Sequence, residues 1–135
     1  MDIRKKQRAV VEALEDVKGR DIVVYNVAKL SPIFERVVIA SGDSTRQVRA
    51  LADRVREHLR ELGAPAHGME GGRNAEWVLV DLGDIVVHVM HPSVRSYYNL
   101  EEIWGGKEVR LKTAAAPRRR GKPSRGPAPR RIRSE

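Results

Sequence analysis

Two amphipathic helical segments alternate with four short runs of β-branched residues, and this order limits the possible folds more than any other feature of the chain. Residues 3–18 carry apolar side chains at helical spacing, and Gly19 follows as a candidate C-cap. A second helix is expected between Ser44 and Gly63, because Ser44 can cap the amide of Gln47 while the Gln47 side chain reaches back. Both helices need an apolar surface to cover.

The β-branched runs can supply that surface as a sheet. They span residues 21–27, 36–40, 76–82 and 84–90. The first two are almost continuously apolar, as in strands covered on both faces. The last two meet at Gly83 and predict a hairpin, in which Trp77, Leu79 and Asp81 share one face and Val78, Val80 and Leu82 the other.

The remaining segments are shorter. Glycines 68, 71 and 72 indicate a loop, Pro92 suits the first turn of a helix over residues 93–98, and a short helical segment is expected over residues 100–104. The resulting order of helix, two strands, helix, two strands and helix predicts an α/β domain with a mixed sheet flanked by helices.

The net charge divides the chain into two parts. Of the whole-chain net charge of +8, the last 23 residues carry +7, from eight basic groups and one acidic group, so residues 1–112 are almost neutral. Residues 113–135 contain four prolines and one large apolar residue, and we expect a disordered basic tail after a single domain of residues 1–112. This tail is either a solubilising extension or a tether to RNA phosphates. Its candidate RNA contacts are Arg118, Arg119, Arg120, Lys122, Arg130 and Arg131.

Several classes of function are disfavoured. The chain has no cysteine, which excludes thiolate chemistry and cysteine-ligated metals. His88 and His91 lie three apart on a predicted strand and so face opposite sides, which disfavours a shared metal ion. The pair Asp81 and Asp84 faintly resembles the acids of nucleotidyltransferases, but it spans a turn. We expect no enzyme, no metal and no cofactor.

The apolar runs are too short for a membrane span of about 20 residues. The N-terminus lacks the long apolar stretch and cleavage site of a secretory signal. We therefore expect a cytoplasmic protein without a membrane partner.

Residues typical of protein interfaces concentrate near the end of the domain. Large rings and arginine anchor interfaces because they bury much area with few rotatable bonds. Alternatively, about half of the rings in this region belong to the core and cover the sheet. The concentration comprises Trp77, His88, His91, Arg95, Tyr97, Tyr98 and Trp104.

Three motifs in this region carry a resemblance to a known family. The segments VVIASGDSTRQVRALAD, EWVLVDLGDIVVHVMHP and RSYYNLEEIWG, in this order and spacing, resemble the ribosomal silencing factors, also called Iojap proteins. The resemblance covers about residues 5–111. It implies a nucleotidyltransferase-like fold without the catalytic carboxylates.

The resemblance also implies a function and a partner. Such proteins bind the large ribosomal subunit through ribosomal protein fourteen, block joining of the small subunit and thereby lower translation when nutrients are scarce. Organellar relatives serve in large-subunit biogenesis, and a homodimer is expected when the protein is free. An alternative function is that of an RNA-binding assembly factor tethered by its basic tail.

The matching positions are candidate contacts with the ribosomal protein, and the acidic ones would steer a basic partner. They are Trp77, Asp81, Asp84, His88, Arg95, Tyr98, Leu100, Glu101 and Trp104. The chain departs from the family in one place. Where relatives usually have Asp-Tyr-Phe-Val, it has Glu35, Arg36, Val37 and Val38.

Overall fold

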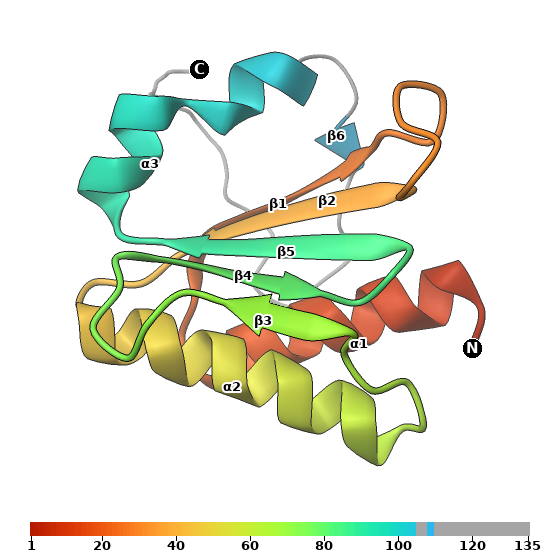
Figure 1. Ribbon diagram of the computed structural model, residues 1–135, viewed down its shortest axis with the longest axis horizontal. Helices are drawn as coiled ribbons and strands as arrows, with labels where there is room; N and C mark the ends of the chain where they lie inside the picture. The colour runs from red at the N-terminus through yellow and green to blue at the C-terminus, as the bar shows by residue number, and fades with distance from the viewer. Residues whose placement is uncertain (105–107, 110–135) are drawn as a thin grey trace.

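The computed structural model describes residues 1–104 and 108–109, and these form one mixed sheet between two helical layers (Figure 1). The helices are α1 (Ile3–Asp16), α2 (Thr45–Glu61), α3 (Pro92–Tyr98) and the 3₁₀ helix η1 (Leu100–Trp104). The strands are β1 (Arg20–Asn26), β2 (Arg36–Ser41), β3 (Gly68–Glu70), β4 (Trp77–Asp81), β5 (Ile85–Met90) and β6 (Glu108–Val109). The expected α/β fold with a mixed sheet is confirmed.

The six strands lie in the order β3-β4-β5-β2-β1-β6. All neighbouring pairs are antiparallel except β2 and β5, which run parallel through the middle of the sheet. The parallel pair requires a crossover, and α2 lies within this connection. β2 consequently has neighbours on both edges and helices on both faces, and five of its six residues are buried.

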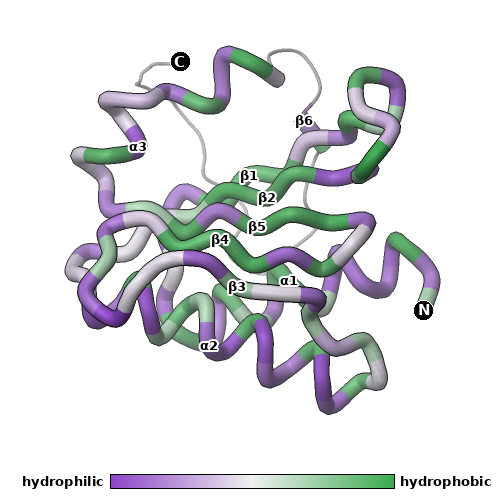
Figure 2. Tube along the Cα trace, in the orientation of Figure 1, coloured by the Kyte–Doolittle hydropathy of each residue, from purple (hydrophilic) through white to green (hydrophobic). Residues whose placement is uncertain are grey.

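α1 and α2 cover one face of the sheet (Figure 1). The main core lies between them and the strands, and the central strands β2, β4 and β5 are largely apolar in Figure 2. Val78 and Val80 of β4 and Val87 and Val89 of β5 point into this core and are fully buried. The predicted division of the hairpin into two faces is therefore confirmed.

α3 and η1 cover the opposite face, where they enclose a second, smaller core. Its fully buried centre consists of Val27, Val37, Ile39 and Met90. Half-buried side chains pack around them, namely Val23, Phe34, Trp77, Val94, Leu100 and Trp104. Val37, one of the residues at which the sequence is expected to depart from the family it resembles, therefore lies in this core rather than on the surface.

The end of α1 differs from the expected glycine cap. The helix ends at Asp16, and the residue with the left-handed backbone is Lys18, with φ of 64°, not Gly19. Gly19 donates its amide to the Leu14 carbonyl at 2.8 Å, and a Cβ at this glycine would lie 3.0 Å from that oxygen. Gly19 follows the left-handed Lys18, and it lacks a Cβ where its backbone lies close to the end of α1.

The start of α2 confirms the expected cap. Ser44 Oγ accepts from the Gln47 amide at 3.1 Å, and Gln47 Oε1 accepts from the Asp43 amide at 2.7 Å. The Gln47 side chain also donates to the Val17 carbonyl at 3.0 Å. This contact ties the start of α2 to the end of α1.

Two short strands were missed by the sequence patterns. Residues 68–70, expected to lie in a loop, form β3 at one edge of the sheet, and residues 108–109 form β6 at the other. Edge strands this short have too few residues to show a period of two. The proposed tail, residues 113–135, and its candidate RNA contacts lie outside the described residues.

Candidate functional site

An aromatic cluster lies where the open end of the β4–β5 hairpin meets α3. The Trp77 indole Nε1–H donates to His88 Nδ1 at 3.0 Å, and the two rings lie 5.8 Å apart. Tyr98 of α3 packs on Trp77 with ring centroids 5.1 Å apart, and Tyr97 meets Tyr98 edge-on at 5.0 Å. We call these four residues the aromatic cluster. It joins β4, β5 and α3 into one surface.

The two tyrosines are the exposed part of this cluster. Tyr97 is 82% exposed and Tyr98 is 55% exposed, whereas Trp77 and His88 are half-buried beneath them. Exposed aromatic rings with a supported inner layer are typical of protein-binding surfaces.

His88 is a neutral member of the cluster. Burial lowers its pKa from 6.5 to about 4. Because Nδ1 accepts the indole hydrogen bond, the ring proton of the neutral form lies on Nε2. His88 therefore contributes shape and a hydrogen bond at neutral pH, and no charge.

Arg95 lies beneath the surface of α3. It is 8% exposed, and its Nη1 donates to the hydroxyl of Ser41 at 2.8 Å. Its Nε and Nη2 both lie 3.1 Å from Glu101 Oε2. The guanidinium thus joins the end of β2, α3 and the start of η1.

η1 has three apolar side chains, of which two point inward and one points outward. Leu100 and Trp104 pack against the smaller core, and the Trp104 ring meets Phe34 edge-on at 6.3 Å. Ile103, between them, is 60% exposed. This packing supports a core role for Trp104, the alternative that the sequence left open.

The candidate acids of the hairpin lie at its other end, away from the aromatic cluster. Asp81 Oδ1 accepts from the Gly83 amide at 2.9 Å and so stabilises the turn. Asp84 pairs with Lys6 of α1 at 2.6 Å. Asp81 lies four positions along an extended strand from Trp77, a distance of about 13 Å. The structure therefore does not bring these acids to the same place as Trp77 and His88.

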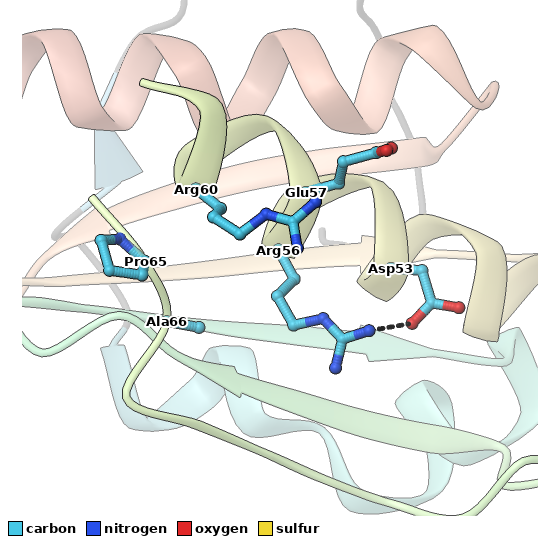
Figure 3. Close-up of a pocket in the computed structure, with 6 residues that line it drawn as sticks. All are labelled: Asp53, Arg56, Glu57, Arg60, Pro65 and Ala66. Carbon is cyan, nitrogen blue, oxygen red and sulfur yellow. Dashed lines mark ion pairs between the residues drawn. The ribbon is translucent and has the colours of Figure 1, made fainter. Parts of the chain in front are cut away.

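Within residues 1–104 and 108–109, no group of three or more histidines, aspartates or glutamates is arranged to hold a metal ion. His91 instead caps α3, its Nδ1 accepting from the Ser93 amide at 3.3 Å. A hollow on the α2 side has a lining of mixed charge, in which Arg56 and Asp53, neighbours on α2, form an ion pair at 3.6 Å (Figure 3). None of the helices in the described part is long and apolar enough to cross a membrane.

Sequence patterns under-rated several exposed apolar residues. Tyr97 and Ile103 were not among the candidate contacts, although both are more exposed than Tyr98. The loop between β1 and β2 adds Leu30, 54% exposed, and Ile33, 79% exposed. Tyr97 was recognised as one of the interface-type residues of this region, whereas the signal for the others was only their proximity to Trp104 and Phe34 in the chain, which does not reveal exposure.

The fold and the site define a small α/β protein with an exposed aromatic face on one side of its sheet. Comparison with known proteins gives its family. The family model described as "Ribosomal silencing factor during starvation" matches residues 1–133. The chain belongs to the ribosomal silencing factor family, as the sequence motifs predicted. The match runs past residue 112, and the domain boundary there stays a prediction.

The similar proteins agree with this family. The ribosomal silencing factor of Chromobacterium violaceum is 48% identical over 116 residues, which is 86% of this chain and 95% of that protein. A crystal structure of a protein from the same organism has a TM-score of 0.77 at 48% identity and covers 86% of this chain and 97% of that one. The mouse protein named mitochondrial assembly of ribosomal large subunit protein 1 is 34% identical, over 70% of this chain and 43% of its own length.

Proposed function

We propose that this protein represses translation in the cytoplasm under nutrient limitation by occupying the large ribosomal subunit. It binds ribosomal protein fourteen of that subunit and sterically blocks joining of the small subunit. Membership in the ribosomal silencing factor family supports this proposal. The family name itself refers to silencing of ribosomes during starvation.

One observation carries the choice of binding face. Tyr97, Tyr98 and Ile103 expose large apolar side chains on the layer formed by α3 and η1. Clustered exposed apolar groups mark protein-binding surfaces, since burying them in a complex is favourable. The two tyrosine rings are already packed, Tyr98 on Trp77 and Tyr97 on Tyr98, so little of their side-chain entropy is lost on binding.

This mechanism needs no chemistry at the site. Steric exclusion depends only on where the protein sits on the subunit, so the function requires neither a cofactor nor a nucleophile. The acidic candidates have internal partners, since Asp84 pairs with Lys6 and Glu101 with Arg95. Their contribution to steering a basic partner is therefore secondary to the aromatic contact.

The experiment that tests the proposal is sedimentation of purified large and small subunits with and without the full-length protein. It is run at matched Mg²⁺ and at two salt concentrations, beside a variant lacking residues 113–135. Comigration with large subunits and loss of whole ribosomes, in both proteins, is expected. Whole ribosomes forming normally at saturating protein would contradict the proposal.

A second candidate function is large-subunit assembly with RNA binding by the basic tail. The name of the mouse relative and the +7 charge of residues 113–135 favour it. Counterion release makes such binding steeply dependent on salt. In the same experiment, binding that weakens sharply with salt and disappears with the tail would select this function.

We also propose that the free protein forms a homodimer. A second copy could cover the same exposed aromatic face in the free protein. Sedimentation velocity of the wild type and of Tyr98→Ala tests it, since a dimer formed through this face would dissociate more readily in the variant.

A further inference from the structure

We propose that Arg95 is a positioning residue, which clamps η1 in the orientation needed for ribosome binding by holding Ser41 and Glu101 at once. This inference rests on the proposed function, because it assigns a role within the same binding face. It differs from a direct contact, in which the guanidinium itself would touch the partner.

The geometry of the guanidinium supports a clamp. Its three nitrogens are all engaged inside the protein, with Ser41 Oγ at 2.8 Å and Glu101 Oε2 at 3.1 Å from two nitrogens. Arg95 is 8% exposed and Ser41 is 1% exposed. A partner arriving at this face would therefore meet the surrounding side chains before the guanidinium.

The segment on the other side of the clamp has few other attachments. Asn99, between α3 and η1, adopts a left-handed backbone with φ of 49°, which turns the chain sharply. Within the described residues, the backbone hydrogen bonds of this turn are local, from the Asn99 amide to the Arg95 carbonyl at 2.9 Å and from the Glu102 amide to the Asn99 carbonyl at 3.2 Å. Beyond these, the packing of Leu100 and Trp104 and the Arg95–Glu101 pair fix η1 to the sheet.

The planar fork of arginine is required for this role. Two of its nitrogens face Glu101 while the third faces a hydroxyl on another element, and the single ammonium of lysine is a point charge that cannot reproduce this arrangement. Ser41 lies at the end of β2, the most buried strand, and so provides a rigid anchor. The clamp thereby fixes η1, and with it the exposed Ile103, relative to the sheet.

The test uses full-length protein and the variants Arg95→Lys and Glu101→Gln. Both substitutions preserve the size of the side chain. Glu101 is more exposed than Arg95, so Glu101→Gln is expected to fold even if Arg95→Lys does not. The matched control is Arg54→Lys, since Arg54 pairs with Asp16 at 3.1 Å on the opposite face of the sheet. Three quantities are measured, namely amide hydrogen exchange of residues 99–104, exchange of α1 and α2, and affinity for purified large subunits.

Both test variants are expected to speed exchange in residues 99–104 alone and to lower the affinity about tenfold, as for a binding-competent state reduced to about a tenth of the molecules. Arg54→Lys is expected to leave residues 99–104 and the affinity unchanged. A merely structural role would also speed exchange in α1 and α2. Exchange confined to residues 99–104 together with weaker binding therefore supports the clamp.

Four results would overturn the inference. Unchanged exchange at residues 99–104 shows that Arg95 does not hold η1. Faster exchange that extends into α1 and α2 shows a general structural role. Weaker binding for Arg95→Lys but not for Glu101→Gln shows that the guanidinium contacts the partner directly. If wild-type protein does not bind large subunits, the proposed function fails and the positioning role fails with it.

Discussion

Trp77 donates its indole N–H to Nδ1 of His88 across the β4–β5 pair, over 3.0 Å. The two residues are diagonal neighbours on one face of the sheet, because Trp77 pairs with Met90 and Leu79 with His88. The hydrogen bond fixes the plane of the indole on which Tyr98 packs. Protonation of His88 at Nδ1 would remove this hydrogen-bond acceptor, so the aromatic cluster depends on the protonation state of His88.

The stability of the protein is expected to fall as the pH decreases from about 6.5 to about 4. The pKa of His88 is about 4 in the folded protein and 6.5 in the unfolded chain, so within this window the unfolded state binds the extra proton. The loss is on the order of 3 kcal/mol, by the free energy that corresponds to this difference in pKa. Chemical denaturation at a series of pH values measures it.

The control for this pH dependence is His88→Gln, which removes the titrating group. Its stability is expected to vary less than that of the wild type between pH 6.5 and 4, because the contribution of His88 is then absent. Equal pH dependence in the two proteins would show that His88 is not the group responsible.

Tyr98→Ala is expected to weaken binding to large subunits by about 2 kcal/mol, as for a truncated interface anchor. Tyr98 is 55% exposed, so the fold should survive its removal. The matched control is Leu62→Ala, an apolar residue 47% exposed at the end of α2 on the other side of the molecule. Equal affinities for the two variants would remove Tyr98 from the binding face.

Trp104→Ala is expected to show both a binding and a stability effect. The ring is half-buried, contacts Phe34 and packs on the smaller core, so its loss should cost about 3 kcal/mol of unfolding free energy. Large-subunit affinity should fall as well, since η1 loses one of its two inward anchors. A stability close to that of the wild type would indicate that Trp104 does not anchor η1.

The end of α1 predicts opposite effects at adjacent residues. Lys18→Gly is expected to stabilise the protein by about 0.5–1 kcal/mol, because a left-handed φ costs glycine nothing. Gly19→Ala is expected to destabilise it by about 1–3 kcal/mol, because the new Cβ would lie 3.0 Å from the Leu14 carbonyl oxygen and 3.1 Å from Leu51 Cδ2. Thermal or urea unfolding distinguishes the signs, and a stabilising Gly19→Ala would contradict this account.

Much of the fold could be predicted from local pattern. The period of α2, its Ser44 cap and the alternation of buried valines in β4 and β5 are properties of neighbouring residues, and the structure confirms each. The short edge strands β3 and β6 could not be predicted in the same way. Two or three residues form a strand only when a neighbouring strand supplies hydrogen bonds. For β6 this neighbour is β1, which is far away in the sequence, and for β3 it is β4, whose place depends on the rest of the sheet.

The candidate site also has features that sequence patterns reveal and features that depend on the tertiary structure. Sequence by itself determined the family, through three motifs, and the presence of rings and charges near Tyr98. Tertiary structure decided which of them meet, placing His88 beneath Trp77, Arg95 between Ser41 and Glu101, and Asp84 against α1. The physical reason is that exposure and pairing depend on how α3, η1 and the sheet pack together, whereas residue type and period are set along the chain.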